Sequence, residues 1–228
     1  MSAALERFPT AILASGAGTN LQGVLDRVAS GELQLDVRVV VSNRRSALAI
    51  ERARRAGIPV SVLPFERDRE TRSQYARRIA HEIERHGARL VLLLGWMHVL
   101  APEFLNHGFD GVLNLHPSYL PEDPAQDTVT LPDGSTSRVY RGAHALRDAI
   151  AAHEPMTGAS LIEITPEADR GPLLARRPFA LRPDDSVESA LARLHPVEQD
   201  VVAEGIRIWL ARQEAARSTS TFSRHEKS

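Results

Sequence analysis

The first half of the chain alternates short apolar runs with longer segments in which apolar residues recur at helical spacing. The apolar runs are 9–14, 35–41, 59–63, 90–94 and 112–115, and the helical segments are 21–28, 47–56 and 71–86. Strands that alternate with helices predict an α/β fold with a mainly parallel sheet. The run 90–94 is apolar at every position, which is typical of a central strand covered on both faces.

The second half has a different pattern. Residues 122–140 are rich in Pro, Asp, Thr and Ser and show little periodicity, so they predict a long loop, and such loops are commonly functional or mobile. The polar segment 215–228 predicts a disordered tail. Between them we expect a helix, two strands and a long helix that Pro196 interrupts, at 144–152, 159–164, 173–181 and 187–212.

Two residue types that carry much of enzyme chemistry are almost absent. The 228 residues include no cysteine and one lysine, Lys227. A disulfide framework, a thiolate nucleophile and a cysteine zinc site are therefore excluded. A catalytic lysine would have to come from the end of the chain. Any nucleophile is then expected to be a hydroxyl, a carboxylate or an imidazole, or to belong to the substrate.

Size, charge and hydropathy together indicate one soluble domain in the cytoplasm. The hydrophobic share of 43% is ordinary for a globular protein, and 28 basic residues against 29 acidic ones argue against a nucleic-acid binder. The N-terminus has an acid at Glu6 and no apolar stretch, so it does not resemble a secretory signal. The longest apolar run, 90–96, is too short to span a bilayer.

A glycine loop, Ser-Gly-Ala-Gly-Thr-Asn at 15–20, lies between the first strand and the first helix. Glycines permit close backbone approach, and the free amides of a helix N-terminus favour an anion. The loop is no dinucleotide fingerprint, because Leu21 stands where the third glycine would be. It predicts either a phosphate site or a tight turn that uses glycine for its dihedral angles.

Asn114 and His116 end another apolar strand, and a spacing of two places both side chains on the same side. Open α/β sheets bind ligands at the carboxyl ends of their strands. An amide beside an imidazole can stabilise an oxyanion and move a proton. Asp169, in the turn Asp-Arg-Gly-Pro, could orient or charge His116. The alternatives are a structural histidine and an aspartate that only forms a turn.

The remaining histidines and serines predict no metal site and no serine triad. His81 and His86 lie about 140° apart around their predicted helix, so they do not share a face as a zinc pair would. No serine lies in a Gly-x-Ser-x-Gly elbow, and Ser118 lacks a recognisable base and acid.

Taken in order, these pieces resemble the folate-dependent formyltransferases, in particular the phosphoribosylglycinamide formyltransferases of purine synthesis. The resemblance runs from about Thr10 to Ile208. Its most specific part is Asn-Leu-His-Pro-Ser-Tyr-Leu-Pro at 114–121 together with Asp169, and the segment Gly-Trp-Met-His-Val-Leu at 95–100 looks like the family's folate-binding segment. The family has an open, mostly parallel twisted sheet with helices on both faces. That domain would occupy residues 1–214, before the tail.

The resemblance implies formyl transfer from 10-formyltetrahydrofolate to the amine of glycinamide ribonucleotide through a tetrahedral intermediate, without a metal. Asn114 and protonated His116 would stabilise the oxyanion, and Asp169 would support the imidazolium. The implied substrate-binding residues are Gly16, Gly18, Thr19, Asn20 and Glu198, and the implied folate-binding residues are Arg72, Met97, His98, Val99 and Leu100. A homodimer is one assembly open to such a protein; neither nucleic acid nor a membrane is an expected partner.

Three departures from the family leave the acceptor amine open. Ile162 stands where the family has a histidine, His98 replaces an arginine of the folate pocket, and 122–140 looks like an insertion, followed by Arg141 in place of proline. The alternatives are a formyltransferase for another small amine, such as an amino sugar, and a non-catalytic relative that binds folate or phosphate. A formyltetrahydrofolate deformylase is disfavoured because the first strand begins near Pro9, and methionyl-tRNA formyltransferase is disfavoured by the balanced charge.

Overall fold

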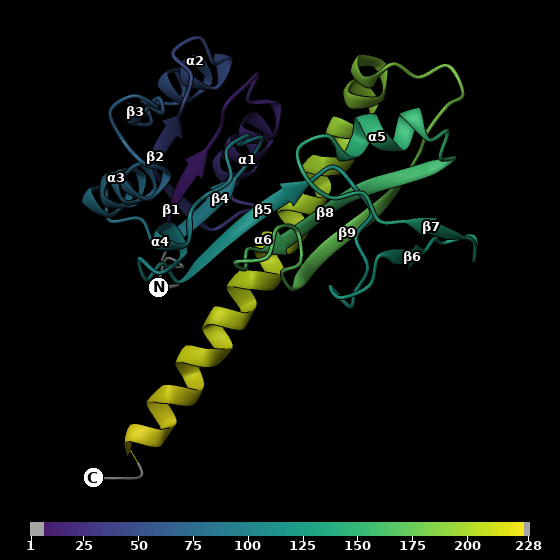
Figure 1. Cartoon of the computed structure of the whole chain (residues 1–228). Helices are drawn as coiled ribbons and strands as arrows, with labels where there is room; N and C mark the ends of the chain where they lie inside the picture. Colours follow the sequence, from purple (N-terminus) through teal and green to yellow (C-terminus); the bar gives the residue numbers. More distant parts are fainter. Residues whose placement is uncertain (1–6, 226–228) are drawn as a thin grey trace.

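A seven-stranded mixed sheet forms the centre of the molecule in the computed structural model, which describes residues 7–225 and their side chains as far as Ser218 (Figure 1). Its strand order is β3-β2-β1-β4-β5-β8-β9. The strands are β1 (Phe8–Leu13), β2 (Leu35–Ser42), β3 (Val60–Val62), β4 (Leu90–Leu93), β5 (Gly111–His116), β8 (Met156–Glu163) and β9 (Leu173–Ala180). The first five strands are parallel, and β8 and β9 are antiparallel to their neighbours. The predicted α/β fold with a mostly parallel sheet is confirmed.

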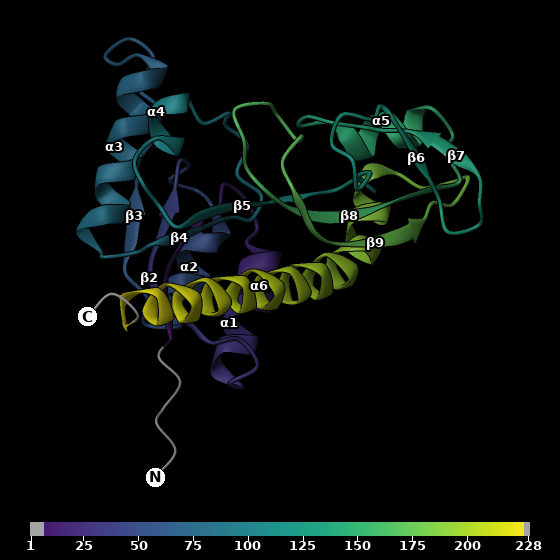
Figure 2. The same cartoon turned by 90° about the horizontal axis from the view of Figure 1, so that it is seen from below.

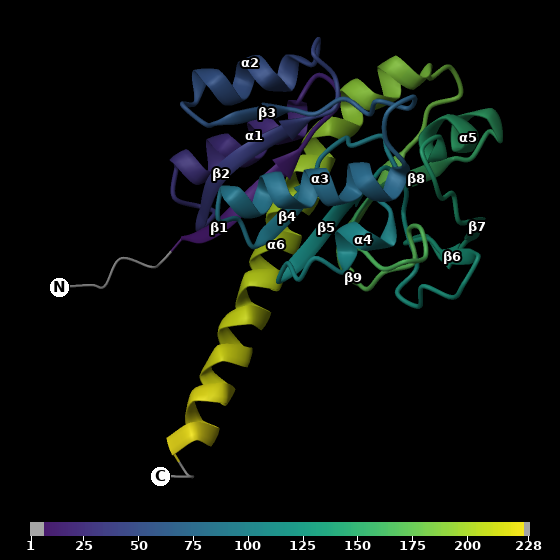
Figure 3. The same cartoon turned by 60° about the vertical axis from the view of Figure 1, so that its left-hand side comes forward.

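Helices cover both faces of the sheet, as predicted (Figure 3). They are α1 (Thr19–Ala29), α2 (Leu48–Arg55), α3 (Arg72–Arg85), α4 (Pro102–Leu105), α5 (Ala145–Ala151) and α6 (Val187–His225). Side chains along β1 point alternately to the two faces of the sheet, so this strand contributes to the hydrophobic core on each face. Ile12 packs with α1, α2 and α6, whereas Leu13 packs with α3 and α4. Thr71 and Gln74 form a capping box that begins α3. The short α4 was not predicted, because a single turn is too short to show the helical repeat of apolar residues.

The long C-terminal helix departs from the sequence prediction in two ways. Pro196 lies inside α6 without ending it, and the helix continues to His225 where a disordered tail was predicted from residue 215. The Ser218 hydroxyl donates to the Glu214 carbonyl at 3.0 Å, and the Arg217 guanidinium lies 5.3 Å from the Phe8 ring. The Arg217 contact holds α6 against the body (Figure 2), and beyond the sheet the helix projects outward to its end (Figure 1). Residues 226–228 of the predicted tail lie outside the described residues.

The segment 122–140 is also more ordered than its composition predicts. It contains a two-stranded antiparallel hairpin, β6 (Thr128–Thr130) and β7 (Thr136–Arg138). Val129 is buried in a small cluster with Leu120, Leu131, Val139 and, from β8, Ile162. Strands of three residues are too short to show a period, so the sequence pattern concealed them.

Within the described residues, no helix has the length and apolar character needed to cross a membrane.

Candidate active site

A cavity of about 550 Å³ opens at the carboxyl ends of β4 and β5. Its walls come from α1, the segment after β4, the ends of β5 and β8, the start of α5 and the residues before it, the turn before β9, and α6. The predicted site residues that line it are Asn20, Met97, His98, Val99, Leu100, Asn114, His116, Asp169 and Glu198. Gly16, Gly18, Thr19 and Arg72 are the predicted site residues that do not line it. The structure thus brings together residues from both ends of the chain.

His116 is held between two oxygen acceptors. Its side chain is only 4% exposed, and its Nδ1 lies 3.5 Å from Oδ1 of Asp169. Its Nε2 lies 2.9 Å from the main-chain oxygen of Tyr140, which can only accept a hydrogen bond, so Nε2 carries the proton.

The Asp169 carboxylate gathers three groups. Oδ1 faces His116 and accepts a hydrogen bond from the Asn114 side-chain amide at 3.3 Å, and Oδ2 accepts one from the main-chain N–H of Gly142 at 2.7 Å. Asp169 has a φ of 52°, in the left-handed region that aspartate tolerates better than most residues. The turn that was predicted from the Asp-Arg-Gly-Pro segment therefore aims this carboxylate at the two residues that end β5.

The glycine loop lies at the edge of the cavity and reaches it through Asn20. Gly18 caps α1 at a φ of 70°, and a Cβ there would meet the Cα of Ala49 at 2.7 Å, so the loop needs glycine for packing against α2. No side chain caps α1, and its first turn contains no acid. An N-terminus of this kind favours an anion. Arg52 lies beside it, with Nε donating to the carbonyl of Ala17 at 2.9 Å.

Glu198 is a buried carboxyl on α6 that faces the start of α1. It is 4% exposed, and its Oε2 accepts a hydrogen bond from the Asn20 amide at 2.8 Å. Burial raises the pKa of Glu198, and the hydrogen bond from Asn20 offsets part of that shift. A partly satisfied carboxyl in a cavity wall is suited to receive a donor from a ligand.

The segment 95–100 presents exposed apolar side chains, and His98 in this segment feels the charge of three arginines. Met97 is 50% exposed and Val99 75%, which is unusual for residues of this type in a cavity wall. Burial lowers the pKa of His98, and the charges of three arginines lower it further: Arg72, Arg44 and Arg67. The charge of Arg72 therefore reaches His98, although Arg72 does not line the cavity.

An ion-pair bridge that was not predicted connects the segment 122–140 to the Asp169 turn. The Asp127 carboxylate accepts hydrogen bonds from Arg141 at 2.8 Å and from Arg170 at 2.6 Å. Arg141 also donates through Nε to the carbonyl of Asp169 at 3.3 Å. We call Arg141, Asp127 and Arg170 the carboxylate bridge. It places the segment 122–140 next to Asp169.

Four further residues at or near the cavity were also missed: His144, His195, Arg44 and Arg67. His195 precedes Glu198 by three positions on a helix, a spacing that places both on one face. Arg44 and Arg67 follow the carboxyl ends of β2 and β3, the edge where ligands bind in such sheets. The positions of His195, Arg44 and Arg67 could therefore have been inferred from the sequence, whereas no sequence pattern indicated His144.

Known proteins are similar to this chain in both sequence and fold. The sequence model of the formyl transferase family matches residues 9–206. The chain is 32% identical over 190 residues to phosphoribosylglycinamide formyltransferase of Escherichia coli, covering 83% of this chain and 81% of that protein. It is 30% identical over 210 residues to the enzyme of that name from Schizosaccharomyces pombe, covering 86% and 93%. Glycinamide ribonucleotide transformylase 1 from Symbiobacterium toebii superposes with a TM-score of 0.78 at 28% identity, covering 91% of this chain and 89% of that one.

Proposed function

The chain belongs to the formyl transferase family, and from this premise we propose that it transfers a formyl group from 10-formyltetrahydrofolate to the amine of glycinamide ribonucleotide. The observation that carries the proposal is the convergence of Asn114, His116 and Asp169 at one cavity. An amide, an imidazole and a carboxylate are the groups that an acyl transfer between two bound substrates needs. The nucleophile is the amine of the substrate, so the reaction does not require a cysteine of the protein.

In the proposed reaction the substrate amine attacks the formyl carbon. A C–N bond forms, the carbonyl electron pair moves to oxygen, and collapse of the tetrahedral intermediate expels the folate nitrogen, which takes up the proton that the amine loses. The Asn114 amide and the His116 imidazolium donate to the oxyanion, and each such donor contributes about 10²–10³ in rate. Asp169 holds both donors in place through Oδ1.

The fit to folate rests on the segment 95–100. Its exposed apolar side chains, Met97 and Val99, suit a flat heterocycle, and Arg44, Arg67 and Arg72 suit the carboxylates of such a ligand. Met97, His98, Val99 and Leu100 would form the wall against which it lies.

The phosphate of the ribonucleotide would lie against the glycine loop. Gly16, Gly18, Thr19 and Asn20 supply backbone amides at the N-terminus of α1, and Arg52 supplies charge beside them. A lysine is not needed, which fits a chain whose single lysine is Lys227. Glu198 would accept a hydrogen bond from the sugar or the amine.

A formyltransferase for another small amine is the second candidate. Ile162 is buried opposite Asn114 on the neighbouring strand and lines the cavity, so an apolar side chain faces the reacting groups. The insertion 122–140 lies over the same end of the site. Both features could select an acceptor of different shape, while the oxyanion-binding residues stay the same.

A formyl-transfer assay tests the proposal, with 10-formyltetrahydrofolate as donor and either glycinamide ribonucleotide or small amino sugars as acceptor. We expect turnover with the ribonucleotide and a loss of at least about 10²-fold in His116→Ala. Equal rates for wild type and variant would refute the mechanism. Turnover only with an amino sugar would replace the acceptor and keep the mechanism.

A further inference from the structure

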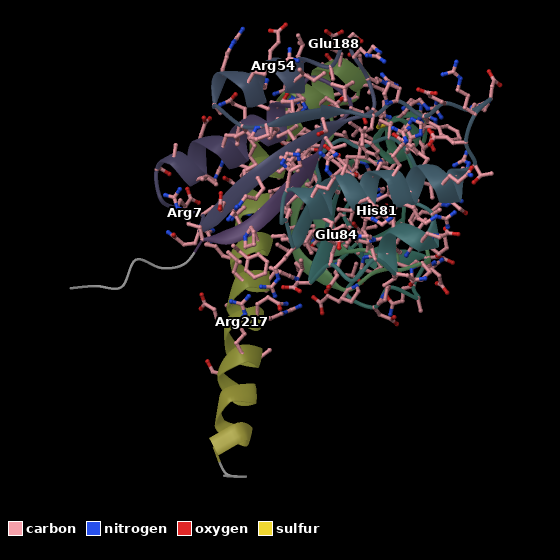
Figure 4. The ribbon with its side chains drawn as sticks, turned by 90° about the vertical axis from the view of Figure 1, so that its left-hand side faces the viewer. Arg7, Arg54, His81, Glu84, Glu188 and Arg217 are labelled. Atoms are coloured by element: carbon pink, nitrogen blue, oxygen red, sulfur yellow. The ribbon has the colours of Figure 1, made fainter. Side chains whose placement is uncertain are left out.

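Two histidines and a glutamate converge where α3 meets the turn after α4, outside the lining of the catalytic cavity. Figure 4 labels two of them, His81 and Glu84, which lie on α3 at a spacing that places them on one face. The third, His107, follows α4. Within the described residues, these are the only three histidine, cysteine or acidic side chains whose ligand atoms gather in this way, all within 4.8 Å of one another.

The distances are those of a tetrahedral metal site. Oε2 of Glu84 lies 3.4 Å from Nδ1 of His81 and 3.3 Å from Nε2 of His107. With metal–ligand bonds of about 2.0–2.1 Å, the edges of a zinc tetrahedron are about 3.3 Å long. Two edges of the triangle therefore already have the length that zinc requires.

The Nε2 atom of His107 is free to act as a metal ligand, because it makes no hydrogen bond among the described residues. It is buried and has no hydrogen-bond partner among the described residues, although Oε2 of Glu84 lies 3.3 Å away. The ring is fixed from two sides, by Phe109 at 5.1 Å and by the edge of His81 at 5.1 Å between ring centroids. A cation between the three side chains would use the lone pair that Nε2 otherwise leaves unsatisfied.

The charges around the cluster leave Glu84 free for a cation. Arg85 pairs with Glu82 at 2.9 Å, and Arg77 lies 4.0 Å from Glu103. In the described part of the chain no arginine forms an ion pair with Glu84, whose partners are the two histidines. In a protein whose other acids pair mainly with arginine, this carboxylate is unusual.

We propose that His81, Glu84 and His107 bind a divalent transition metal, with zinc as the best match, and that water completes the tetrahedron. Two imidazoles and one carboxylate form a ligand set typical of zinc. The metal ties α3 to the turn after α4. Because α4 directly follows the segment 95–100, the bound metal also steadies the end of that cavity wall. Spacing along the chain did not predict this site, because His107 lies on a different element.

Calorimetric titration of zinc chloride into the untagged full-length chain tests the proposal. We expect one zinc per chain, and binding weaker by roughly tenfold or more in Glu84→Gln and in His107→Ala. His86→Ala is the matched control, because His86 caps the end of the same helix beside Glu82 at 3.4 Å but has no third ligand. It should bind zinc as the wild type does.

Two further measurements make the result decisive. Cobalt should give the visible absorption of a tetrahedral complex, and zinc should raise the Tm of the wild type and of His86→Ala but not of Glu84→Gln. Glu84 is 65% exposed, so Glu84→Gln keeps the fold even if His107→Ala does not. No zinc binding, or equal affinity in Glu84→Gln and wild type, would overturn the proposal and, in the second case, place the zinc elsewhere.

Discussion

The main-chain oxygen of Tyr140 lies 2.9 Å from Nε2 of His116. The last residue of the segment 122–140 thus contacts the imidazole to which we assign stabilisation of the oxyanion. Tyr140 is itself anchored, because its hydroxyl donates to Oε1 of Glu154 at 2.8 Å, and burial together with this bond raises its pKa to about 12. The insertion orients the imidazole in the free protein, and an oxyanion that uses Nε2 has to displace the Tyr140 oxygen.

The carboxylate bridge should matter for turnover, because Asp127 joins Arg141, next to Tyr140, to Arg170, next to Asp169. In Asp127→Asn the charge is lost and both arginines are released in part. We expect kcat to fall on the order of tenfold with a smaller change in KM, since small displacements of reacting groups are costly. Asp127→Glu should recover part of the loss.

The matched control for the bridge is Asp133→Asn at the tip of the same hairpin, where the carboxylate bonds only within its own turn, to Ser135. Its kcat should equal that of the wild type. Steady-state kinetics with thermal melts of all four proteins checks this, and a similar kcat in Asp127→Asn and Asp133→Asn would rule out a positioning role.

Asp169→Asn separates the charge of Asp169 from its conformation. Asparagine also tolerates a φ of 52°, so the turn and the fold should persist, whereas Asp169→Ala adds backbone strain of about 1–2 kcal/mol. Loss of the carboxylate beside His116 should lower kcat by at least about 10²-fold in both variants. Kinetics and unfolding of the pair check the point; an active Asp169→Asn would limit Asp169 to a structural role.

Glu198→Gln tests the raised pKa of the buried carboxyl. A raised acid pKa means that the folded state prefers the protonated form, so the stabilisation is complete below the ordinary value of 4.5 and is lost as the pH rises through the folded value. Glutamine keeps an acceptor for Asn20 without a charge. The Tm of Glu198→Gln should therefore exceed that of the wild type at neutral pH, and the difference should disappear in acid. Melts across pH test this, and a lower Tm at neutral pH would contradict it.

Gly171 should not tolerate a side chain. A Cβ there would lie 1.5 Å from the main-chain oxygen of Glu163, so the backbone between β8 and β9 would have to shift. We expect Gly171→Ala to cost at least about 2 kcal/mol of unfolding free energy. Gly16→Ala is the control for stability, since a Cβ at Gly16 meets nothing within 4 Å, and it should stay within about 0.5 kcal/mol. Urea unfolding compares them, and equal midpoints would contradict this reading.

Most of the sheet and its helices could be predicted from the sequence, because period and run length are local properties. The strand 90–94 and the capping-box helix after Thr71 are examples. Asn114 and His116 were also predictable as a pair, since a spacing of two at the end of a strand fixes their common side. The hairpin in 122–140 and the course of α6 beyond residue 214 were not predictable in this way, because their stability comes from contacts with distant residues.

The sequence by itself therefore determined which elements form and which side chains stand at the ends of strands. Only the tertiary structure decided which of those side chains meet. Asp169 reaches His116 through a turn that lies 53 positions along the chain, and Asp127 joins the insertion to that turn. His107 meets Glu84 across two helices. Such meetings depend on how the whole chain packs, and no periodicity along the sequence records which distant residues packing brings together.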